Sequence, residues 1–443
     1  MSEVTLQTLL LACLTWAANA AAATLTVDAA GGDYRTIAAA IARAQDGDTV
    51  RVKPGTYRES IRPRSHLRLV AEAGPVRTRV FVERGGRALF LDQVQDVVIE
   101  GFDFCSVPGA GKPGDGFVAV TKCADITIRD CYVHDAPNDA DCIKVSDTRR
   151  LVLERCCVWN PGRRGEQTGF QEGMDTRAKD FEITVRGCWF FQTEQGGDTL
   201  IFCKGGCFDI LWEDNIFGPS VGQGHANVPV QSGHQNAGER GDEVPTYPSG
   251  RFVVRNNLFV GLRGEAAFGF QGPDTSLLYN NVFYRNETTP SLITITDNPG
   301  SVRGPALRLF SLNNLFAANG DVPYYRQRNA PKSLANLKVT HNAYAHDAGG
   351  DVKISAEPGA LIGRDPLFVA PQIPAFDFAK GPAQIQAARA GFRLSPGSPA
   401  RGAGTDPFRF AAEAHPSAIP AMRMTVPADE RWDIGLRDFG PAR

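Results

Sequence analysis

Short apolar segments of four to six residues, rich in Val, Ile and Phe, recur along the chain between polar turns. Each segment is followed by two mostly polar residues, then by a small Cys or Asn, then by apolar or aromatic residues. Runs this short and this rich in β-branched and aromatic residues predict strands rather than helices. In chain order the segments read "ITIRDCYV", "LVLERCCV", "ITVRGCWF", "ILWEDNIF", "FVVRNNLF", "SLLYNNVF", "FSLNNLF" and "LKVTHNAY".

The small residue marks one repeated position, whose successive spacings vary from 24 to 42 residues. A period of this size with variable insertions is typical of a solenoid. We expect Asn there because it tolerates left-handed backbone angles at a sharp turn, and because stacked asparagines can hydrogen-bond along the stack. We expect the cysteines to continue this ladder as small buried groups. The repeated positions are Cys131, Cys156, Cys188, Asn215, Asn257, Asn281, Asn314 and Asn342.

The two ends of the repeat set the boundaries of the expected domain. The segment "YRTIAAAIARA" has helical spacing and predicts a short helix that caps the first coil of the stack. The pattern stops in the mid-340s, so we expect a parallel β-helix over residues 24–345. Residues 346–443 are then expected to cap or flank the stack, because an open end exposes unpaired strand edges.

One insertion in the repeat is rich in Gly, Pro and polar residues and shows no strand pattern. It begins "GPSVGQGHANVPV" and predicts a long loop that contains His225, His234 and Tyr247. Loops of this length in compact folds often have a function.

The N-terminus contains an apolar run, "TLLLACLTWAANAAAATLTV", with small residues at its end. This pattern predicts a secretory signal over residues 1–23, and therefore a secreted or periplasmic protein with no membrane span after cleavage. No Lys or Arg precedes the run and Glu3 does, so a misassigned start or a buried N-terminal helix are the alternatives.

Composition narrows the classes of partner. The formal net charge is −2, which gives no general electrostatic attraction to nucleic acid or to an anionic membrane surface. Ten cysteines are present, of which Cys13 lies in the predicted signal. Their spacing does not fit a zinc site, and we expect a monomer.

Candidate chemistry lies in three segments that fall on successive coils: "APNDADCIKVS", "FQEGMDTRA" and "GGDTLIFCKGG". Stacking brings equivalent positions of adjacent coils about 4.8 Å apart, so these acidic residues become neighbours. Carboxylates at this density repel one another unless a cation lies between them, and an oxygen-rich site suits calcium better than zinc. The carboxylates are Asp139, Asp141, Glu172, Asp175 and Asp198.

Three basic residues accompany these acids. Lys204 stands between an apolar strand and two glycines, which leave room for a polymer, but both faces of its strand are apolar and its direction stays open. Lys144 alternates with Ile143 and Val145, which places it outward and makes it a rival base. Arg177 either holds a sugar carboxylate or balances Asp175. His134, beside Asp135, is expected in a loop.

The repeat resembles the right-handed parallel β-helix of the pectate-lyase-like superfamily, an all-β fold with a short N-terminal capping helix and an irregular C-terminal cap. The segments "NDADCIK", "EGMD" and "FCKGG" resemble family 9 polysaccharide lyases, whose pocket contains only Asp, so Glu172 is a departure. This resemblance implies that Lys204 is the base and that calcium is held at four positions. These positions are Asp139, Asp141, Glu172 and Asp175. From their own placement we expect Lys144 and Arg177 to contact the substrate.

The expected function is therefore a secreted lyase that cleaves a uronic-acid-containing, pectate-like polysaccharide by calcium-assisted β-elimination. "DTLIFCKGGCFDILWEDNIF" also resembles the lysine-bearing strand of family 6 lyases, which act on alginate or chondroitin-type chains, although their Arg-His-Gly segment is missing. A glycoside hydrolase on the same fold needs two carboxylates about 5–10 Å apart. A non-catalytic carbohydrate-binding β-helix is the remaining alternative, because fold does not imply function.

Overall fold

A computed structural model gives the fold of the chain. It describes residues 22–84, 86–107, 116–138, 140–162, 171–177, 179–193, 199–221, 228–233, 249–296, 308–328, 331–414 and 432–437. Residues 1–21 of the expected signal, and the loop residues His225, His234 and Tyr247, lie outside these ranges. No helix in the described ranges is long and apolar enough to cross a membrane.

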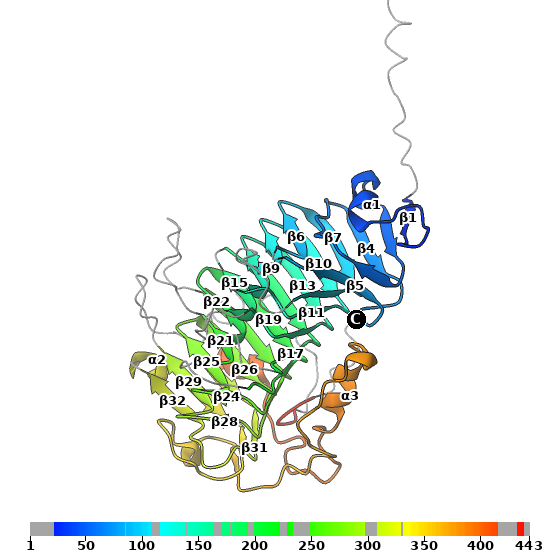
Figure 1. Cartoon of the computed structure of the whole chain (residues 1–443). Coiled ribbons are helices and arrows are strands. Elements are labelled where there is room, and N and C mark those ends of the chain that lie inside the picture. Colours follow the sequence, from blue (N-terminus) through cyan, green and yellow to red (C-terminus); the bar gives the residue numbers. More distant parts are fainter. Residues whose placement is uncertain are drawn as a thin grey trace, which may run out of the picture.

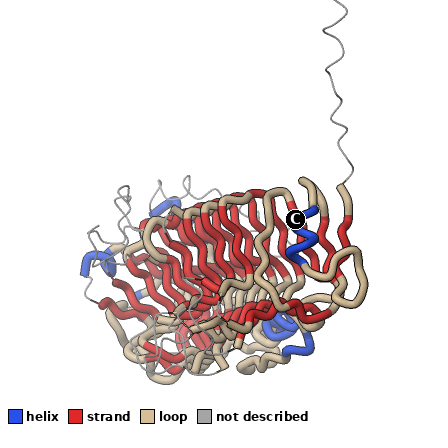
Figure 2. Tube along the Cα trace, turned by 45° about the horizontal axis from the view of Figure 1, so that its top comes forward, coloured by secondary structure: helices blue, strands red, loops and turns tan. Residues whose placement is uncertain are grey.

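The chain winds into a parallel β-helix, and each turn of the winding is called a coil below (Figure 1). A typical coil contributes one strand to each of three long sheets, which we name sheets A, B and C. Figure 2 shows the strands stacked in rows along the molecule. The all-β solenoid expected from the repeat is confirmed.

Sheet A has 12 strands, which are β1 (Thr24–Val27), β2 (Thr49–Val52), β4 (Leu67–Ala71), β7 (Gln95–Glu100), β10 (Ala124–Arg129), β13 (Arg149–Glu154), β16 (Phe181–Arg186), β19 (Cys207–Glu213), β22 (Ser249–Arg255), β26 (Asp274–Tyr279), β30 (Leu309–Leu312) and β33 (Leu337–Thr340). Sheet B also has 12 strands, which are β3 (Gly55–Tyr57), β5 (Thr78–Val82), β8 (Asp103–Ser106), β11 (Tyr132–His134), β14 (Cys157–Trp159), β17 (Trp189–Phe191), β20 (Ile216–Phe217), β23 (Leu258–Val260), β27 (Val282–Tyr284), β31 (Leu315–Ala317), β34 (Ala343–Tyr344) and β35 (Leu361–Ile362).

Sheet C is shorter and has nine strands, which are β6 (Leu89–Asp92), β9 (Gly116–Thr121), β12 (Asp141–Ser146), β15 (Glu172–Arg177), β18 (Thr199–Cys203), β21 (Val230–Ser232), β25 (Phe268–Gln271), β29 (Ile293–Thr296) and β32 (Tyr325–Arg328). A small extra sheet pairs β24 (Arg263–Gly264) with β28 (Glu287–Thr288). The α-helices of the described ranges are α1 (Ile37–Arg43), α2 (Pro331–Ala335), α3 (Gln384–Ala390) and α4 (Pro407–Ala414).

The interior of the stack is a continuous apolar core that receives side chains from all three sheets. Strand β13 shows the pattern, with Leu151 and Leu153 fully buried and Val152 between them only half-buried. Helix α1 lies over the first coils and buries Ile37 and Ile41 against this core, which confirms the expected cap. The Glu59 carboxylate accepts hydrogen bonds from two backbone N–H groups in the first turn of α1, at 2.9 Å each, which satisfies donors that a helix end leaves free.

A ladder of buried asparagines lies at the turn between sheets A and B and confirms the stacking expected from the repeat. From Asn257 onward, each side-chain oxygen accepts bonds from the backbone N–H and the side-chain amide of the ladder residue one coil earlier, at 2.7 to 3.1 Å. A carboxylate replaces the amide at the end, so the ladder ends on a residue that only accepts. Its members are Asn215, Asn257, Asn281, Asn314, Asn342 and Glu357.

Cysteines extend the ladder toward the N-terminus. The backbone N–H of Cys188 donates to the Asn215 side-chain oxygen at 2.9 Å, and the N–H of Cys156 donates to the Cys188 sulfur at 3.4 Å. Cys131 accepts in the same way from Phe102 of the preceding coil. All nine cysteines after Cys13 are free thiols and buried, so their expected role in packing holds.

The reason expected for Asn at this turn is partly wrong. The left-handed residue is the one immediately before each ladder position, for example Asp214 with φ 60° and Asn256 with φ 55°. The ladder asparagines themselves are not among the residues with positive φ. Asn therefore suits the ladder position because its side chain offers both a hydrogen-bond donor and an acceptor, whereas the residue before it adopts the left-handed conformation that bends the chain.

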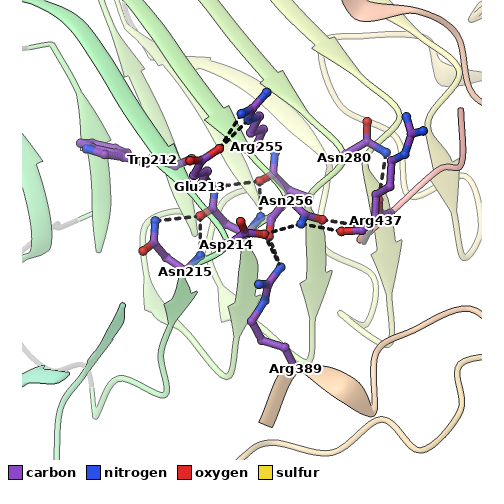
Figure 3. A network of polar contacts seen from close by, with 12 residues as sticks. Trp212, Glu213, Asp214, Asn215, Arg255, Asn256, Asn280, Arg389 and Arg437 are labelled. Atoms are coloured by element: carbon purple, nitrogen blue, oxygen red, sulfur yellow. Dashed lines mark hydrogen bonds and ion pairs between the residues drawn. The ribbon is translucent and has the colours of Figure 1, made fainter. Parts of the chain in front are cut away.

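The C-terminal segment lies along the side of the stack. Phe376 and Phe378 pack against aromatic side chains of sheet B, and the Tyr132 hydroxyl donates to the Phe378 carbonyl at 3.0 Å. Figure 3 shows a second attachment, where Arg389 contacts Asp214 and the Asn256 carbonyl at 3.1 and 2.7 Å. Within its described residues the segment combines the short helices α3 and α4 with irregular structure.

Replacement of a central ladder residue tests how much the ladder stabilises the stack. Asn281→Ala removes the acceptor of two bonds from Asn257 and the donor to Val254, and leaves those buried groups without partners. We expect a loss of about 3 kcal/mol or more in the free energy of unfolding. Cys188→Ala, at the equivalent position, removes only weak sulfur contacts and should cost clearly less. Chemical denaturation followed by circular dichroism measures both, and equal losses would contradict a hydrogen-bond role for the ladder.

Candidate functional site

Three adjacent strands of sheet C bring the predicted acidic and basic residues together. Strand β12 pairs with β15 and β15 pairs with β18, so that Lys144 lies beside Asp175 and Asp175 lies beside Phe202. Asp141 and Glu172 are the first residues of β12 and β15. Residues separated by about 30 positions in the sequence therefore become direct neighbours in one cluster.

Three carboxylates form the acidic part of the cluster. Asp141, Glu172 and Asp175 each present an oxygen, and these oxygens all lie within 4.8 Å of one another. All three side chains are buried, and Asp175 has no exposed surface. The Asp141 carboxylate also accepts a hydrogen bond from the backbone N–H of Glu172 at 2.9 Å, which ties the two strands together. Asp139 lies outside the described residues.

Both lysines point into this cluster. The Lys204 amine lies 2.9 Å from the Asp175 carboxylate and 3.2 Å from that of Glu172. The Lys144 amine lies 2.9 Å from Asp141 and also contacts Asp175. The direction of Lys204, which strand alternation left open, is therefore toward the carboxylates and not into the apolar interior. Lys204 follows the last residue of β18, where Gly206 with φ 83° turns the chain toward sheet A.

The local geometry depends on glycine at one position that the sequence did not single out. Gly116 starts β9, one coil before β12, and pairs with Asp141. A Cβ atom at Gly116 would lie 2.4 Å from the Cβ of Lys144, so any larger residue would displace the lysine. No repeat signal covers this strand, because the ladder pattern is first recognisable at Cys131.

Arg177 ends β15 and is half-buried. Its backbone N–H donates to the buried Asp180 carboxylate at 2.9 Å, which fixes the end of the strand. The positive charge of Arg177 acts on Lys144 and opposes the charged form of that amine. Arg177 therefore adds a third cation near the carboxylates.

The charges of the cluster are strongly coupled. Burial raises the pKa of Glu172 well above its usual range, and the neighbouring carboxylates Asp141 and Asp175 raise it further. Burial lowers the pKa of Lys204, but Asp175 and Glu172 outweigh burial, so the net pKa is raised. The same balance raises the pKa of Lys144, through Asp141 and Asp175. The carboxylates therefore favour the protonated form of both amines, while burial and the neighbouring acids disfavour the charged form of Glu172.

The donor set fits a hard cation such as calcium. One oxygen of Asp175 is buried without any hydrogen-bond partner, although the other oxygen binds both lysines. Two more buried oxygens, one from Thr199 at the start of β18 and one from Gln171 just before β15, also have no hydrogen-bond partner. Calcium prefers carboxylate and neutral oxygen ligands in irregular geometry, which is the chemistry that these residues offer. Water or substrate oxygens would have to complete the six to eight ligands that calcium takes.

A second cluster of ligand-type side chains lies on sheet B. His134 bridges two carboxylates, with its ring nitrogens 2.8 Å from Asp103 and 2.7 Å from Asp135. The Arg79 guanidinium donates to the other oxygen of Asp103 at 2.7 Å. The two positive and two negative groups balance, so we interpret this cluster as a structural ion-pair network.

The environment of His134 differs from the loop expected for it, and that expectation is wrong. His134 is the last residue of β11 and is buried. Its ring stacks on Trp159 with the centroids 4.0 Å apart and the planes nearly parallel. Trp159 in turn contacts Phe376, so the cluster lies beneath the C-terminal segment.

Comparison with known proteins adds little about activity. No protein-family model and no curated protein matches the chain. Among solved structures, pectate lyase Pel9A is similar at 12% identity and a TM-score of 0.45, over 93% of this chain and 95% of that chain. The A-module of mannuronan C-5 epimerase AlgE4 from Azotobacter vinelandii is similar at 11% identity and a TM-score of 0.40, over 71% and 87%. The surface adhesin PfbA of Streptococcus pneumoniae is similar at 12% identity and a TM-score of 0.42, over 72% and 91%.

These proteins include a lyase, an epimerase and an adhesin, so the similarity concerns the fold alone. The parallel β-helix expected from the resemblance is confirmed by the strand pairing of this chain itself. A function for this chain can therefore be inferred only from the chemistry of its own residues.

The His134 network predicts how stability depends on pH. Burial lowers the pKa of His134, but hydrogen bonds to Asp103 and Asp135 outweigh burial and raise the pKa above 6.5. The stabilisation is fully present below about pH 6.5 and is lost as pH rises through the raised pKa. Each unit of elevation contributes about 1.4 kcal/mol. His134→Gln should therefore flatten the alkaline side of a plot of melting temperature against pH.

His66 offers a matched control for this measurement. It pairs with Asp96 at 3.1 Å on the surface, where an ion pair contributes little. His66→Gln should leave the pH profile unchanged. A His134→Gln profile that keeps the wild-type slope between pH 6.5 and 9 would show that His134 is not the titrating group.

Proposed function

We propose that the protein is a secreted polysaccharide lyase that cleaves a uronic-acid-containing, pectate-like polymer by calcium-assisted β-elimination. The observation that carries the proposal is the cluster of Asp141, Glu172 and Asp175, which combines a buried, unpartnered carboxylate oxygen with two adjacent amines. Few reactions need this combination. Removal of a proton from the carbon beside a carboxylate needs both a nearby cation and a base.

Calcium would be held by the three carboxylates, and bound there it would supply the positive charge that stabilises the anion formed beside a uronate carboxylate. The chain's own part in the reaction is to place a base. The Lys204 amine takes the C5 proton, the C4–O bond of the sugar breaks, and the electron pair of the C5–H bond forms the C4–C5 double bond. The leaving oxygen takes a proton from water and Lys204 returns its proton to the solvent, so that the products are an unsaturated sugar and a new chain end.

Lys204 must be neutral to accept this proton. Its amine is held in the protonated form by Asp175 and Glu172, which outweigh burial. With a divalent cation held by those carboxylates, they would stabilise the lysine charge less, and the positive charge beside the amine would favour its neutral form. Cation binding and activation of the base are therefore coupled in this cluster.

Lys144 is the rival base, and its contacts favour a different role. Its amine contacts two carboxylates, Asp141 and Asp175. Lys204 also contacts Asp175, and its second partner is Glu172. Burial raises the pKa of Glu172, so this carboxyl group holds the lysine charge less firmly. We assign proton abstraction to Lys204 and retention of the substrate carboxylate to Lys144, with Arg177 beside it.

The spacing of the acids disfavours a glycoside hydrolase. A hydrolase separates its two carboxyl groups by about 5–10 Å to admit the sugar or a water molecule. Here the carboxylate oxygens lie within 4.8 Å of one another and share the two lysines. A non-catalytic carbohydrate-binding role would not require a buried lysine beside the cation ligands, and it remains an outcome of the tests.

Substitution of the two lysines tests the assignment of the base. Lys204→Ala should reduce turnover by about 10³-fold or more without any loss of calcium affinity, because it removes the base and no ligand. Lys144→Ala should mainly raise KM. Turnover is followed by the ultraviolet absorbance of unsaturated uronates on pectate and alginate. Activity that survives in Lys204→Ala but not in Lys144→Ala would exchange the two roles, and new chain ends without unsaturated products would indicate hydrolysis.

Removal of one acid tests the calcium site independently of turnover. Calcium at 100 times its Kd should stabilise the folded chain by about 2.7 kcal/mol and raise its melting temperature. Asp141→Asn should lose both this rise and the activity. Asp125→Asn is the control, because Asp125 pairs with Arg150 on the surface of sheet A. A wild-type melting temperature that does not respond to calcium would contradict the proposed cation.

A further inference from the structure

One row of side chains on sheet C continues from the acidic cluster toward the N-terminal end of the stack. The strand pairings place Lys144 beside Ala119 and Ala119 beside Phe90. An isolated bridge before β6 continues this register and places Arg62 beside Phe90. The row therefore runs along the axis of the stack, from Arg62 to Asp175, with one residue contributed by each coil.

Two arginines gather at the far end of this row. The guanidinium carbons of Arg62 and Arg87 lie over the Phe90 ring, 5.1 and 4.4 Å from its centroid. Such contacts hold a guanidinium in place. Arg62 is exposed and Arg87 is half-buried, so the pair can be reached from solvent.

Among the described residues, no acidic group neutralises the charges of these arginines. Within the described residues no carboxylate pairs with either guanidinium, and the Nε of Arg87 is buried without a hydrogen-bond partner. Two like charges on one ring repel each other, and an anion that contacts both would remove this cost. Guanidinium groups present parallel N–H donors that match a carboxylate in two-point contact.

We propose that Arg62 and Arg87 form a subsite for the carboxylate of a second sugar in the same polymer. The inference rests on the proposed function and adds the path of the substrate. Phe90 lies two coils from Lys144 and three from Asp175, which corresponds to roughly 10–14 Å at the interstrand spacing. A 1,4-linked sugar occupies about one such spacing, so this subsite receives the second or third sugar from the reacting one.

One small residue lies between the arginines and the acidic cluster, on the path that the polymer would take. Ala119 is the only member of the row between Phe90 and Lys144, and its side chain ends at Cβ. Ala119 itself therefore projects no large side chain into the path, and its own surface is covered by its neighbours. The substrate lies along the stack rather than around a coil, and chains too short to reach Phe90 lose one anchor.

The experiment measures binding rather than turnover. Lys204→Ala, which should bind without cleaving, is titrated calorimetrically in calcium with galacturonate and mannuronate oligomers of two to six sugars. We expect affinity to rise by about 10-fold or more once the oligomer is long enough to reach the arginines, which corresponds to one charge-assisted contact. Adding Arg62→Gln and Arg87→Gln should abolish this gain and leave disaccharide affinity unchanged.

Arg58 provides the matched control. Its guanidinium lies 5.2 Å from the Phe81 ring, but it pairs with Glu83 and lies near sheet B, outside the row. Arg58→Gln should keep the full length dependence. Methyl-esterified oligomers should show no gain, because the anchor is a carboxylate.

The outcomes separate the two proposals. Hexamer affinity that survives in the double arginine variant, or no gain with length in either oligomer series, overturns the subsite. Arginine-dependent gain with length together with no unsaturated product from the wild-type chain overturns the lyase and leaves the subsite standing. If the double variant folds poorly, the single variant Arg62→Gln replaces it in this measurement, because Arg62 is exposed and its substitution should not disturb the fold.

Discussion

The register between coils is the constraint on which the rest of the molecule depends. The asparagine ladder fixes it, because every ladder amide is buried and bound to both the backbone and the side chain of a neighbouring coil. A shift of one residue would leave a series of buried polar groups unpaired, each at a cost of about 1–3 kcal/mol. It would also turn every strand over, since side chains alternate between faces. Lys144 and Asp175 share the outer face of sheet C only while this register holds.

Stacking in register also concentrates charge, and the sheets handle this in different ways. On sheet A the outer row alternates in sign, so that Arg129 pairs with Glu100 and Arg255 pairs with Glu213, each at 2.6 Å. On sheet C three acids lie together, and two lysines only partly compensate them, since one oxygen of Asp175 has no partner. The ion pairs of sheet A balance their charges without a ligand. The cluster on sheet C has an unsatisfied buried acceptor, which a stable fold alone does not require and which a bound cation would satisfy.

Part of the fold and part of the candidate site could be predicted from the sequence, and physical reasons explain why the other features could not. The ladder was visible because one position per coil is restricted to Asn or Cys, and a restricted position shows as a period even when the insertions vary. The acids could be assigned to one cluster because they lie near the starts of strands in successive coils. The direction of Lys204 could not be predicted, since β18 is apolar on both faces and the lysine follows its last residue. The Arg62 and Phe90 row could not be predicted either, because the coils before Cys131 carry no recognisable ladder residue. The left-handed bend was assigned to Asn, although the preceding residue makes it, because sequence alone does not separate adjacent polar positions.

The distribution of charge along sheet C links the cation to the polymer. Without a cation, three carboxylates lie in the path of a polyanion that the arginines at Phe90 would attract, so the two ends of the row act in opposite directions. A divalent ion held by Asp141, Glu172 and Asp175 would reverse the sign at the acidic end and make the whole row attractive to a polyuronate. The same ion would weaken the hold of Asp175 on Lys204 and favour the neutral amine. Binding of the cation would therefore promote both binding of the polymer and activation of the base, and by thermodynamic linkage a bound polymer would increase the affinity for the cation. In this view the two lysines partly balance the three carboxylates, and they would take up their roles in binding and proton transfer only when a cation replaces them.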